Sequence, residues 1–349
     1  MNLNATTLLM RADASAETGI GHIGRCTALA AAWREQGGKV VLAASGPHQA
    51  LQSMAGDLPL VWLGASRPMQ TEDIAATLQA ASVCQANVVL IDSYSHDLQF
   101  ESALRRALPL IAVDDLASRE HDCDILIDTS AQPGDDCLYR AAADDGTVLL
   151  LGTSYIVLRQ PFPAFAFAAR SGTGRLLVSF GGTDPQGHSG LALDAVAACA
   201  AICPPVDLVL TGANPACAAL QQRAASLPGV TVHVDTGGMA ALMAGAGLAF
   251  GSGGSTSWER CRAGLPALVT IAADNQIGIA RRRESAGIIR IVQPANATSM
   301  GGALAAALAD HGWRASASRA GMALVDGGGG GRLVAAIANH LGARLNRGG

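Results

Sequence analysis

Short runs of apolar residues recur along the first half of the chain, and stretches of mixed polarity separate them. In one such stretch Cys26, Leu29 and Trp33 share a face at helical spacing, and Gly37-Gly38 ends the helix. Unbroken apolar strands joined by helices predict a parallel sheet that is covered on both faces. The predicted strands span residues 7–10, 39–43, 88–91, 110–113, 125–127 and 148–151.

The alternation lapses between residues 159 and 175, where prolines, glycines and small residues predict a linker. It then restarts, so the chain predicts two doubly wound α/β domains, at 1–165 and 172–349. Ligands of such sheets bind at the carboxyl ends of strands, and we expect a site in the cleft between the domains. The second domain has predicted strands at 175–180, 206–211, 230–234, 248–251, 266–271 and 288–292, helices at 189–203, 214–226, 238–246, 255–263 and 276–286, and two further helices around 327–331.

Composition limits the classes of function. The 349 residues are 50% hydrophobic and 15% charged, which suits two domains with large cores and excludes a disordered chain. A net charge of -4 argues against a nucleic-acid-binding surface and against a polybasic membrane face. Lys39 is the only lysine, so lysine Schiff-base or P-loop chemistry has no residue to use elsewhere.

The cysteines and the start of the chain bear on its compartment. The 8 cysteines are scattered and none forms a C-x-x-C pair, which predicts reduced core residues of a cytoplasmic protein. Leu8-Leu9-Met10 is too short for a signal peptide and is followed at once by Arg11. Residues 239–250, the most apolar stretch, contain glycines and are too short to span a bilayer. We therefore expect a cytoplasmic protein without stable membrane association.

A glycine-rich segment follows the first predicted strand. Gly19, Gly21 and Gly24 have the spacing G-x-G-x-x-G, where glycines admit a ligand to the backbone and a helix N-terminus favours anions. The dinucleotide interpretation lacks its acidic residue, because the second strand runs into Ala44-Ser45-Gly46. His22 in this turn is either a titratable group beside a ligand or a helix-capping or core histidine. The pattern alone leaves both interpretations open.

Three polar loops of the second half each join a strand to a helix. The loop at 179–185 forms either a nest of backbone N–H groups or an ordinary turn in which Asp184 caps the helix. The loop at 251–260 has the small and hydroxyl residues of a phosphate site, and Glu259 in the following helix can reach ribose hydroxyls. The loop at 273–276 is either part of that site or a capping turn. Together they predict a nucleotide-phosphate site.

Other chemistries fit the sequence less well. His121, Cys123 and Asp124 include metal-ligand types, but alternating residues of a strand point to opposite faces. Asp114-Asp115 is better explained as a cap of the following turn than as a cation site. No G-x-S-x-G nucleophile elbow occurs. We expect neither a metal nor a cofactor.

Taken together and in this order, these motifs resemble the UDP-2,4-diacetamido-2,4,6-trideoxy-β-L-altropyranose hydrolases of pseudaminic acid biosynthesis. That family is similar to the GT-B glycosyltransferase that makes lipid II from UDP-GlcNAc. Two places depart from its pattern: Thr129-Ser130 replaces an Asn-containing stretch, and Gln160-Pro161 replaces an acidic residue before Phe162. The matching residues are Arg11-x-Asp13-x-Ser15, Gly21-His22-x-x-Arg25-Cys26, Ile91-Asp92-x-Tyr94, Val113-Asp114-Asp115, His121-x-Cys123-Asp124, Leu150-Leu151-Gly152-x-x-Tyr155, Leu158-Arg159, Ser179 to Asp184, Gly253-Gly254-Ser255-x-x-Trp258-Glu259 and Asn275-Gln276.

The resemblance implies a GT-B-like fold, two Rossmann-like domains that face a central cleft, and a metal-independent hydrolase. His22 would be the general base that deprotonates water for inverting attack at C1 of the sugar, and UDP would leave. Tyr94 and Asn275 would orient sugar or water. The first domain would hold the sugar and the second UDP, with Glu259 on the ribose. Substrate-binding residues would be Arg11, Asp13, Ser15, Gly21, Arg25, Gly181, Gly182, Thr183, Gly253, Gly254, Ser255, Glu259 and Gln276.

Two other classes of function stay open on the sequence. An inverting GT-B glycosyltransferase that uses a UDP-amino sugar would need the same nucleotide loops, and His22 would then activate an acceptor hydroxyl. Such enzymes of lipid-linked pathways usually carry an apolar and basic patch on the first domain, and Trp33-Arg34 is better explained as core plus rim. A nucleotide-sugar sensor would bind UDP-sugar without turnover. In the hydrolase interpretation the product serves nonulosonic acid synthesis and the glycosylation of flagellin or another surface component.

Overall fold

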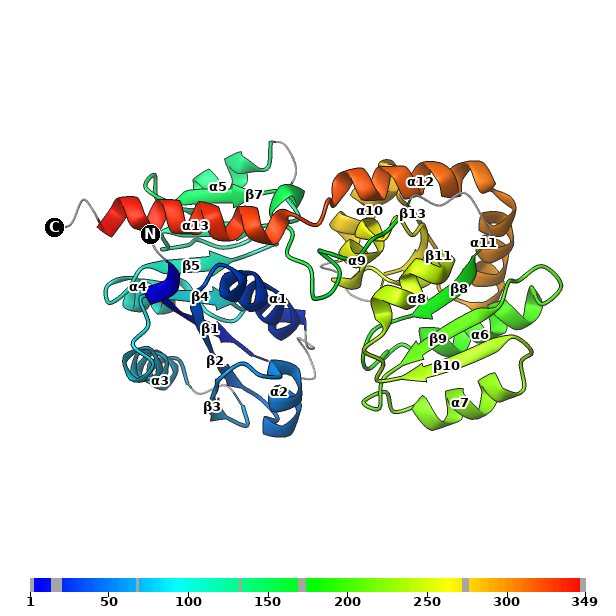
Figure 1. The fold of residues 1–349 in the computed structure, drawn as a ribbon, viewed down its shortest axis with the longest axis horizontal. Helices are drawn as coiled ribbons and strands as arrows, with labels where there is room; N and C mark the ends of the chain where they lie inside the picture. The colour runs from blue at the N-terminus through cyan, green and yellow to red at the C-terminus, as the bar shows by residue number, and fades with distance from the viewer. Residues whose placement is uncertain are drawn as a thin grey trace. The chain divides into compact units, whose positions relative to one another are not determined.

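The computed structural model describes residues 3–13, 21–66, 69–131, 134–168, 174–271 and 276–345. The chain divides into two compact units (Figure 1). Unit 1 comprises Met1–Gln160 and Gly327–Gly349, and unit 2 comprises Pro161–Asp326. Each unit is built on one parallel sheet, as the unbroken apolar runs predict.

The sheet of unit 1 has the strand order β3-β2-β1-β4-β5-β6-β7, and every neighbouring pair is parallel. All six strands predicted in this half are present, and the edge strand β3 is an addition to them. The strands are β1 (Thr7–Ala12), β2 (Lys39–Ser45), β3 (Leu60–Gly64), β4 (Val88–Asp92), β5 (Leu110–Val113), β6 (Ile125–Asp128) and β7 (Val148–Leu151); the helices are η1 (Leu3–Ala5), α1 (Gly21–Glu35), α2 (His48–Ala55), α3 (Gln70–Val83), α4 (Leu98–Arg105), α5 (Asp136–Ala142), η2 (Thr153–Tyr155) and α13 (Gly329–Leu345).

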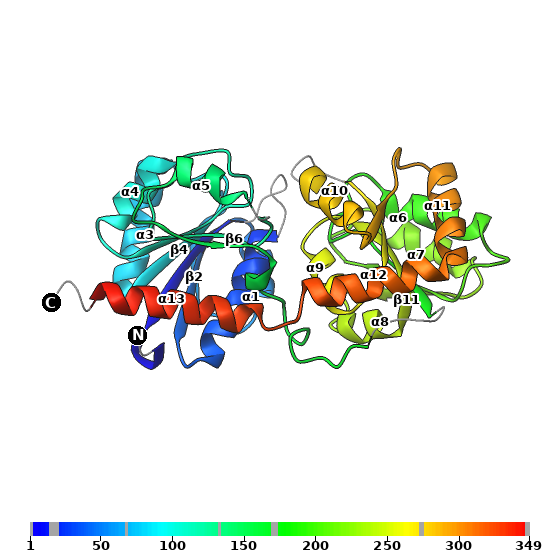
Figure 2. The same cartoon turned by 90° about the horizontal axis from the view of Figure 1, so that it is seen from above.

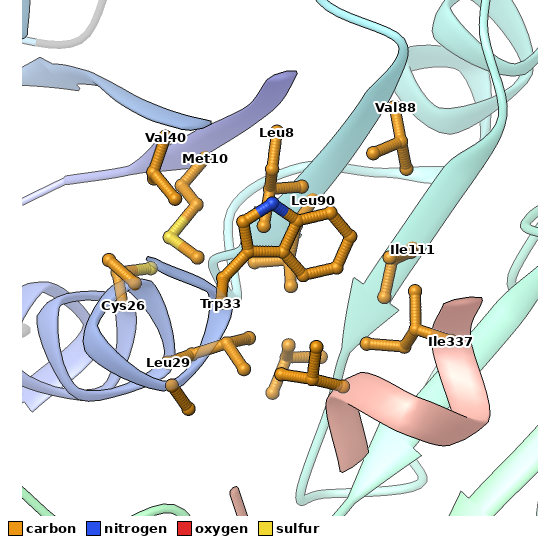
Figure 3. Packing of buried hydrophobic residues seen from close by; sticks show 14 of the residues in the cluster. Leu8, Met10, Cys26, Leu29, Trp33, Val40, Val88, Leu90, Ile111 and Ile337 are labelled. Carbon is orange, nitrogen blue, oxygen red and sulfur yellow. The ribbon is translucent and has the colours of Figure 1, made fainter. Parts of the chain in front are cut away.

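Both faces of this sheet are buried under helices (Figure 2). Side chains alternate between the two faces, so Leu8 and Met10 of β1 pack with α1 and α13, while Leu9 packs with α3 and α4. Trp33 of α1 is 0% exposed and lies among Leu8, Met10 and Ile337 (Figure 3). This double burial explains why the strands are continuous apolar runs rather than alternating ones.

The C-terminal helix α13 belongs to unit 1, whereas the sequence analysis assigned all residues from 172 to 349 to the second domain. The boundary is corrected for a physical reason: Leu333, Val334, Ile337 and Leu341 form one buried face of α13 and complete the core around Trp33. The start of α13 also approaches η2 closely, because a Cβ at position 329 would lie 2.2 Å from the backbone oxygen of Ile156.

The sheet of unit 2 has the order β10-β9-β8-β11-β12-β13 and is also parallel. The predicted strands and helices of this unit are confirmed within a few residues, and α11 is an addition. The strands are β8 (Arg175–Ser179), β9 (Val206–Leu210), β10 (Val230–Val234), β11 (Ala246–Ser252), β12 (Ala267–Thr270) and β13 (Ile289–Ile291); the helices are α6 (His188–Ala198), α7 (Cys217–Ala225), α8 (Met239–Gly245), α9 (Thr256–Arg262), α10 (Ile277–Ser285), α11 (Ala297–Ala309) and α12 (His311–Leu324).

Two expectations about surface and core are tested by the described residues. All the cysteines are free thiols, but Cys137 is exposed, so the prediction that every cysteine lies in a core is wrong there. None of the helices in the described part of the chain has the length and apolar character needed to cross a membrane.

Replacing Ile337 with Ala tests the role of α13 in unit 1. Ile337 is 0% exposed, so the variant loses buried methyl groups and leaves a cavity beside Trp33. We expect the free energy of unfolding to fall by about 2–5 kcal/mol. Asn339→Ala, at an exposed position of the same helix, is the control and should change stability little. Chemical denaturation measures both, and equal stabilities of the two variants would contradict the assignment.

Candidate active site

In unit 1 the strand order reverses at β1, which lies between β2 and β4. At such a switch point the connections leave the carboxyl ends of the strands in opposite directions and make room for a ligand. Ala12 of β1 is paired in register with Asp92 of β4, so Asp13 and Asp92 lie at the same edge. Helix α1 brings His22 to this edge, where the ring meets Asp92.

His22 and Asp92 form a buried pair. The His22 Nδ1 lies 2.6 Å from Asp92 Oδ1, and the residues are 6% and 0% exposed. Burial by itself would raise the pKa of Asp92, but the Arg25 guanidinium and His22 lower it to about 2. An ionised carboxylate only accepts hydrogen bonds, so Nδ1 carries the proton. In this tautomer the lone pair lies on Nε2, and none of the described residues hydrogen-bonds to that atom.

Arg25 fixes the position of Asp92. Its Nε and Nη2 donate to the two carboxylate oxygens of Asp92 at 2.7 and 2.6 Å, and Nη1 donates to Asp115 at 3.1 Å. The side chain of Arg25 is 26% exposed. The cluster of Arg25, Asp92 and Asp115 carries one net negative charge. The bidentate contact of Arg25 keeps the Asp92 carboxylate aimed at the His22 ring.

Tyr94 lies against His22, with the ring centroids 4.7 Å apart and the planes at 79°. Its hydroxyl donates to Asp115 Oδ1 at 2.5 Å. Burial and the Asp115 carboxylate raise the pKa of Tyr94, so the phenol keeps its proton. Tyr94 is therefore suited to orient a neighbouring group and unsuited to remove a proton.

Arg11 does not reach the surface. It is 0% exposed, and its guanidinium donates to Asp73 at 3.0 and 3.1 Å and to Asp13. In this position Arg11 can hold Asp13 in place. A direct contact between Arg11 and substrate, which the sequence analysis expected, is disfavoured. Asp13 Oδ1 also accepts from the backbone N–H of Ser45 at 2.8 Å, while Oδ2 has no partner among the described residues. Asp13 is 17% exposed on its side chain and stays a candidate for substrate contact.

Several polar residues of this edge were missed as site residues. Asp92 was noted in a motif without a role, although an aspartate that ends a buried apolar strand is a usable signal. Asp115 was interpreted with Asp114 as a turn cap. Asp114 does accept from the N–H groups of Leu116 and Ala117, at 3.2 and 2.9 Å, but Asp115 binds Arg25 instead.

His121 has a structural place in unit 1. Its Nδ1 lies 3.0 Å from Glu101 and its Nε2 lies 3.3 Å from Asp114, all fully buried or nearly so. Although burial opposes it, hydrogen bonds to Asp114 and Glu101 raise the pKa of His121. Within the described ranges no cluster of three or more His, Cys, Asp or Glu residues is arranged to hold a metal ion.

Unit 2 has its own switch point between β8 and β11. Gly181, Gly182 and Thr183 follow β8, and Gly253, Gly254 and Ser255 follow β11. Within the described part of the chain, the backbone N–H groups of these six residues have no hydrogen-bond acceptor. Free N–H groups at the carboxyl ends of adjacent strands are suited to an anion.

The turn after β8 is partly the ordinary cap that the sequence left open as an alternative. Asp184 accepts from the N–H groups of His188 and Ser189 at 3.0 and 2.7 Å. Its carboxylate therefore occupies the N-terminus of α6, and that helix end is not available to a phosphate. The free N–H groups of the glycines before it are unaffected.

Glu259 and Gln276 lie beside the loop after β11. Glu259 is in the first turn of α9 and is 3% exposed. Gln276 precedes α10 and packs on Gly253, because a Cβ at position 253 would lie 3.2 Å from Gln276 Oε1. Gly21 is the first residue of α1 and is exposed. Ser15 and Asn275 lie outside the described residues.

Replacing Asp92 with Asn tests the electrostatics of the pair. The folded pKa of Asp92 is about 2, below the ordinary value of 3.8, so the ionised carboxylate stabilises the fold above pH 4. That contribution, about 2–3 kcal/mol, is lost as the pH falls through 2. We expect the stability difference between wild type and Asp92→Asn to shrink from pH 5 to pH 2 in chemical denaturation. A difference that stays constant over this range would show that Asp92 is not held ionised.

Comparison with known proteins bears on the fold. No family model matches the chain, and no curated protein matches it. MurG of Acinetobacter baumannii is 15% identical with a TM-score of 0.63, covering 96% of this chain and 99% of MurG. The S. aureus MnaA–UDP co-structure is 13% identical with a TM-score of 0.69, covering 98% and 97%. The calicheamicin glycosyltransferase CalG4 is 16% identical with a TM-score of 0.64, covering 97% and 99%. The chain thus has the GT-B-like fold of two Rossmann-like units that the sequence predicts.

Proposed function

We propose that the protein is a hydrolase that releases UDP from UDP-2,4-diacetamido-2,4,6-trideoxy-β-L-altropyranose in pseudaminic acid biosynthesis. The observation that carries the proposal is the His22–Asp92 pair, 2.6 Å apart, because it leaves Nε2 as a base at a ligand-binding edge. The identity of the sugar rests on the resemblance of the sequence motifs.

In the proposed reaction a water molecule donates its proton to His22 Nε2 as its oxygen bonds to C1 of the sugar. The bond from C1 to the β-phosphate oxygen breaks, and UDP leaves with the bonding electrons. Attack from the face opposite the leaving group inverts C1. Asp92 stabilises the imidazolium that forms, and Tyr94 orients sugar or water.

UDP is proposed to bind unit 2. The free N–H groups of Gly181, Gly182, Thr183, Gly253, Gly254 and Ser255 support diphosphate binding there without a metal. Glu259 is proposed to bind the ribose, and Gln276 and Asn275 to contact the substrate. In unit 1, Asp13, Ser15, Gly21 and Arg25 are proposed on the sugar side, with Arg11 acting through Asp13.

An inverting glycosyltransferase is the second candidate function. The observation that favours it is the fold shared with CalG4, which is described as a glycosyltransferase. In that case His22 would take a proton from an acceptor hydroxyl instead of water. The position of oxygen label in the products separates the two reactions.

Hydrolysis in H₂¹⁸O, with EDTA present, tests the bond that breaks. We expect the label in the free sugar, unlabelled UDP, and an inverted anomer before mutarotation, because the proposed base activates water against carbon. NMR and mass spectrometry measure these products. Label in UDP would mean attack at phosphorus, and turnover that occurs only with an added acceptor would indicate the glycosyltransferase.

Replacing His22 with Asn tests the base. We expect kcat to fall by about 10²–10⁴, the usual contribution of a general base, while the Kd for UDP stays unchanged. His48→Asn, at an exposed histidine of the same unit, is the matched control and should keep wild-type kcat. Equal kcat values for the two variants would remove His22 from the mechanism.

Replacing Glu259 with Ala tests the ribose contact. We expect KM for the UDP-sugar to rise with a smaller change in kcat, since a charge-assisted hydrogen bond of about 1.5–3 kcal/mol is lost in ground and transition states alike. Uridine binding, measured by calorimetry, should weaken while pyrophosphate binding does not. An unchanged Kd for uridine would exclude this placement.

A further inference from the structure

Arg260 and Arg283 are buried in unit 2 with guanidinium nitrogens that have no partner among the described residues, unlike the buried Arg314, which donates to two backbone oxygens. Arg260 of α9 is 3% exposed and Arg283 of α10 is 4% exposed. Arg260 Nη2 donates to the backbone oxygen of Ser252 and to the hydroxyl of Ser257, and its Nε has no partner. Arg283 Nε and Nη1 have no partner either. Among the described residues neither guanidinium forms an ion pair.

Both side chains are nevertheless cationic. Burial, and then the charge of Arg283, lower the pKa of Arg260 to about 10, although Cys261 and Glu259 act in the opposite direction. Burial lowers the pKa of Arg283 to about 10 as well. At neutral pH both guanidinium groups therefore keep their protons. Buried like charges without a counter-ion destabilise a fold, and native proteins rarely retain them without a compensating role.

Arg260 lies at the carboxyl end of β11, and Arg283 packs on α9, the helix that follows this strand. A Cβ at position 251 would lie 2.5 Å from Arg260 Nη1, so this guanidinium packs directly under the last residues of the strand. Arg283 stacks on Trp258 of α9, with its guanidinium carbon 3.9 Å from the ring centroid. The residues that follow β11, Gly253 to Ser255, are those with free backbone N–H groups.

We propose that Arg260 and Arg283 form a buried cationic base whose counter-charge is an anionic ligand, a diphosphate, bound at the carboxyl end of β11. This inference rests on the proposed UDP site and names the charge that makes it selective for the diphosphate. The two arginines attract the diphosphate through their electric field rather than by direct contact, because a charge is screened weakly in the protein interior. Without the ligand they cost stability, and with it they add affinity.

A purely structural role for Arg283 makes the opposite prediction. If its stacking on Trp258 mainly stabilises unit 2, then removing the guanidinium must lower the melting temperature and leave anion binding intact. A methionine at 283 fills similar space, contacts the Trp258 ring through its sulfur and carries no charge. R283M therefore separates the two roles, and R260M repeats the test at the second charge.

The test measures binding of inorganic pyrophosphate, uridine and UDP to the full chain by calorimetry, together with the melting temperature. For R283M we expect a melting temperature at or above that of wild type without ligand. Its Kd for pyrophosphate should rise about tenfold or more, and its Kd for uridine should not change. R281M removes an exposed charge from the same helix and is the matched control for net charge. It should bind pyrophosphate like wild type.

The outcomes also separate this inference from the proposed function. Pyrophosphate binding by wild type that R283M and R260M lose supports the cationic base, whether or not UDP is the natural ligand. UDP and pyrophosphate bound equally by wild type and both variants would overturn the inference and leave the UDP site standing. Absence of pyrophosphate and UDP binding in wild type would overturn both. A melting temperature of R283M well below that of R281M would assign Arg283 to structure alone.

Discussion

The buried carboxylate of Asp92 is the constraint on which the arrangement of unit 1 depends. It receives hydrogen bonds from His22 and from two nitrogens of Arg25 while it is itself 0% exposed. If the charge of Asp92 is removed, the tautomer of His22 is no longer specified, and Arg25 keeps Asp115 as its carboxylate partner. The position of Asp92 follows from the sheet, because register with Ala12 places it at the switch point beside β1. The side chain of Asp92 thus links the strand order of the sheet, its own ionisation and the orientation of the His22 ring.

The partners of buried cationic side chains differ between the two units. In unit 1 the buried Arg11 has Asp73 and the partly buried Arg25 has Asp92, so the geometry is fixed before any ligand arrives. In unit 2 the acceptors that Arg260 has among the described residues are neutral. A paired network suits a base that must hold one orientation. An unpaired cation suits a binding surface at which an anionic ligand supplies the counter-charge.

Much of the fold could be predicted from the sequence. Strands that are buried on both faces are continuous apolar runs, and helices have apolar residues at a regular spacing. Edge strand β3 was not predicted, because its residues are only partly buried and its apolar run is short. Helix α13 was recognised but assigned to the wrong domain, since periodicity says which face is apolar and not which core it meets. The sequence motifs indicated a candidate site, and the structure places His22 of that candidate beside Asp92. His22 was identified from its motif, but Arg11 looks the same in sequence whether it meets a ligand or Asp73, and the buried state of Arg260 and Arg283 depends on tertiary packing.

The return of α13 to unit 1 sets the order in which the protein can be completed during synthesis. Unit 2 is one continuous segment, so it can fold as soon as its residues have left the ribosome. Unit 1 emerges first, yet its groove beside Trp33 stays uncovered until Leu333 to Leu341 have been translated. The half of the protein that is made first is therefore finished last. A nascent chain halted after residue 326 would carry a complete unit 2 and an apolar face on unit 1 that is open to chaperones or to aggregation.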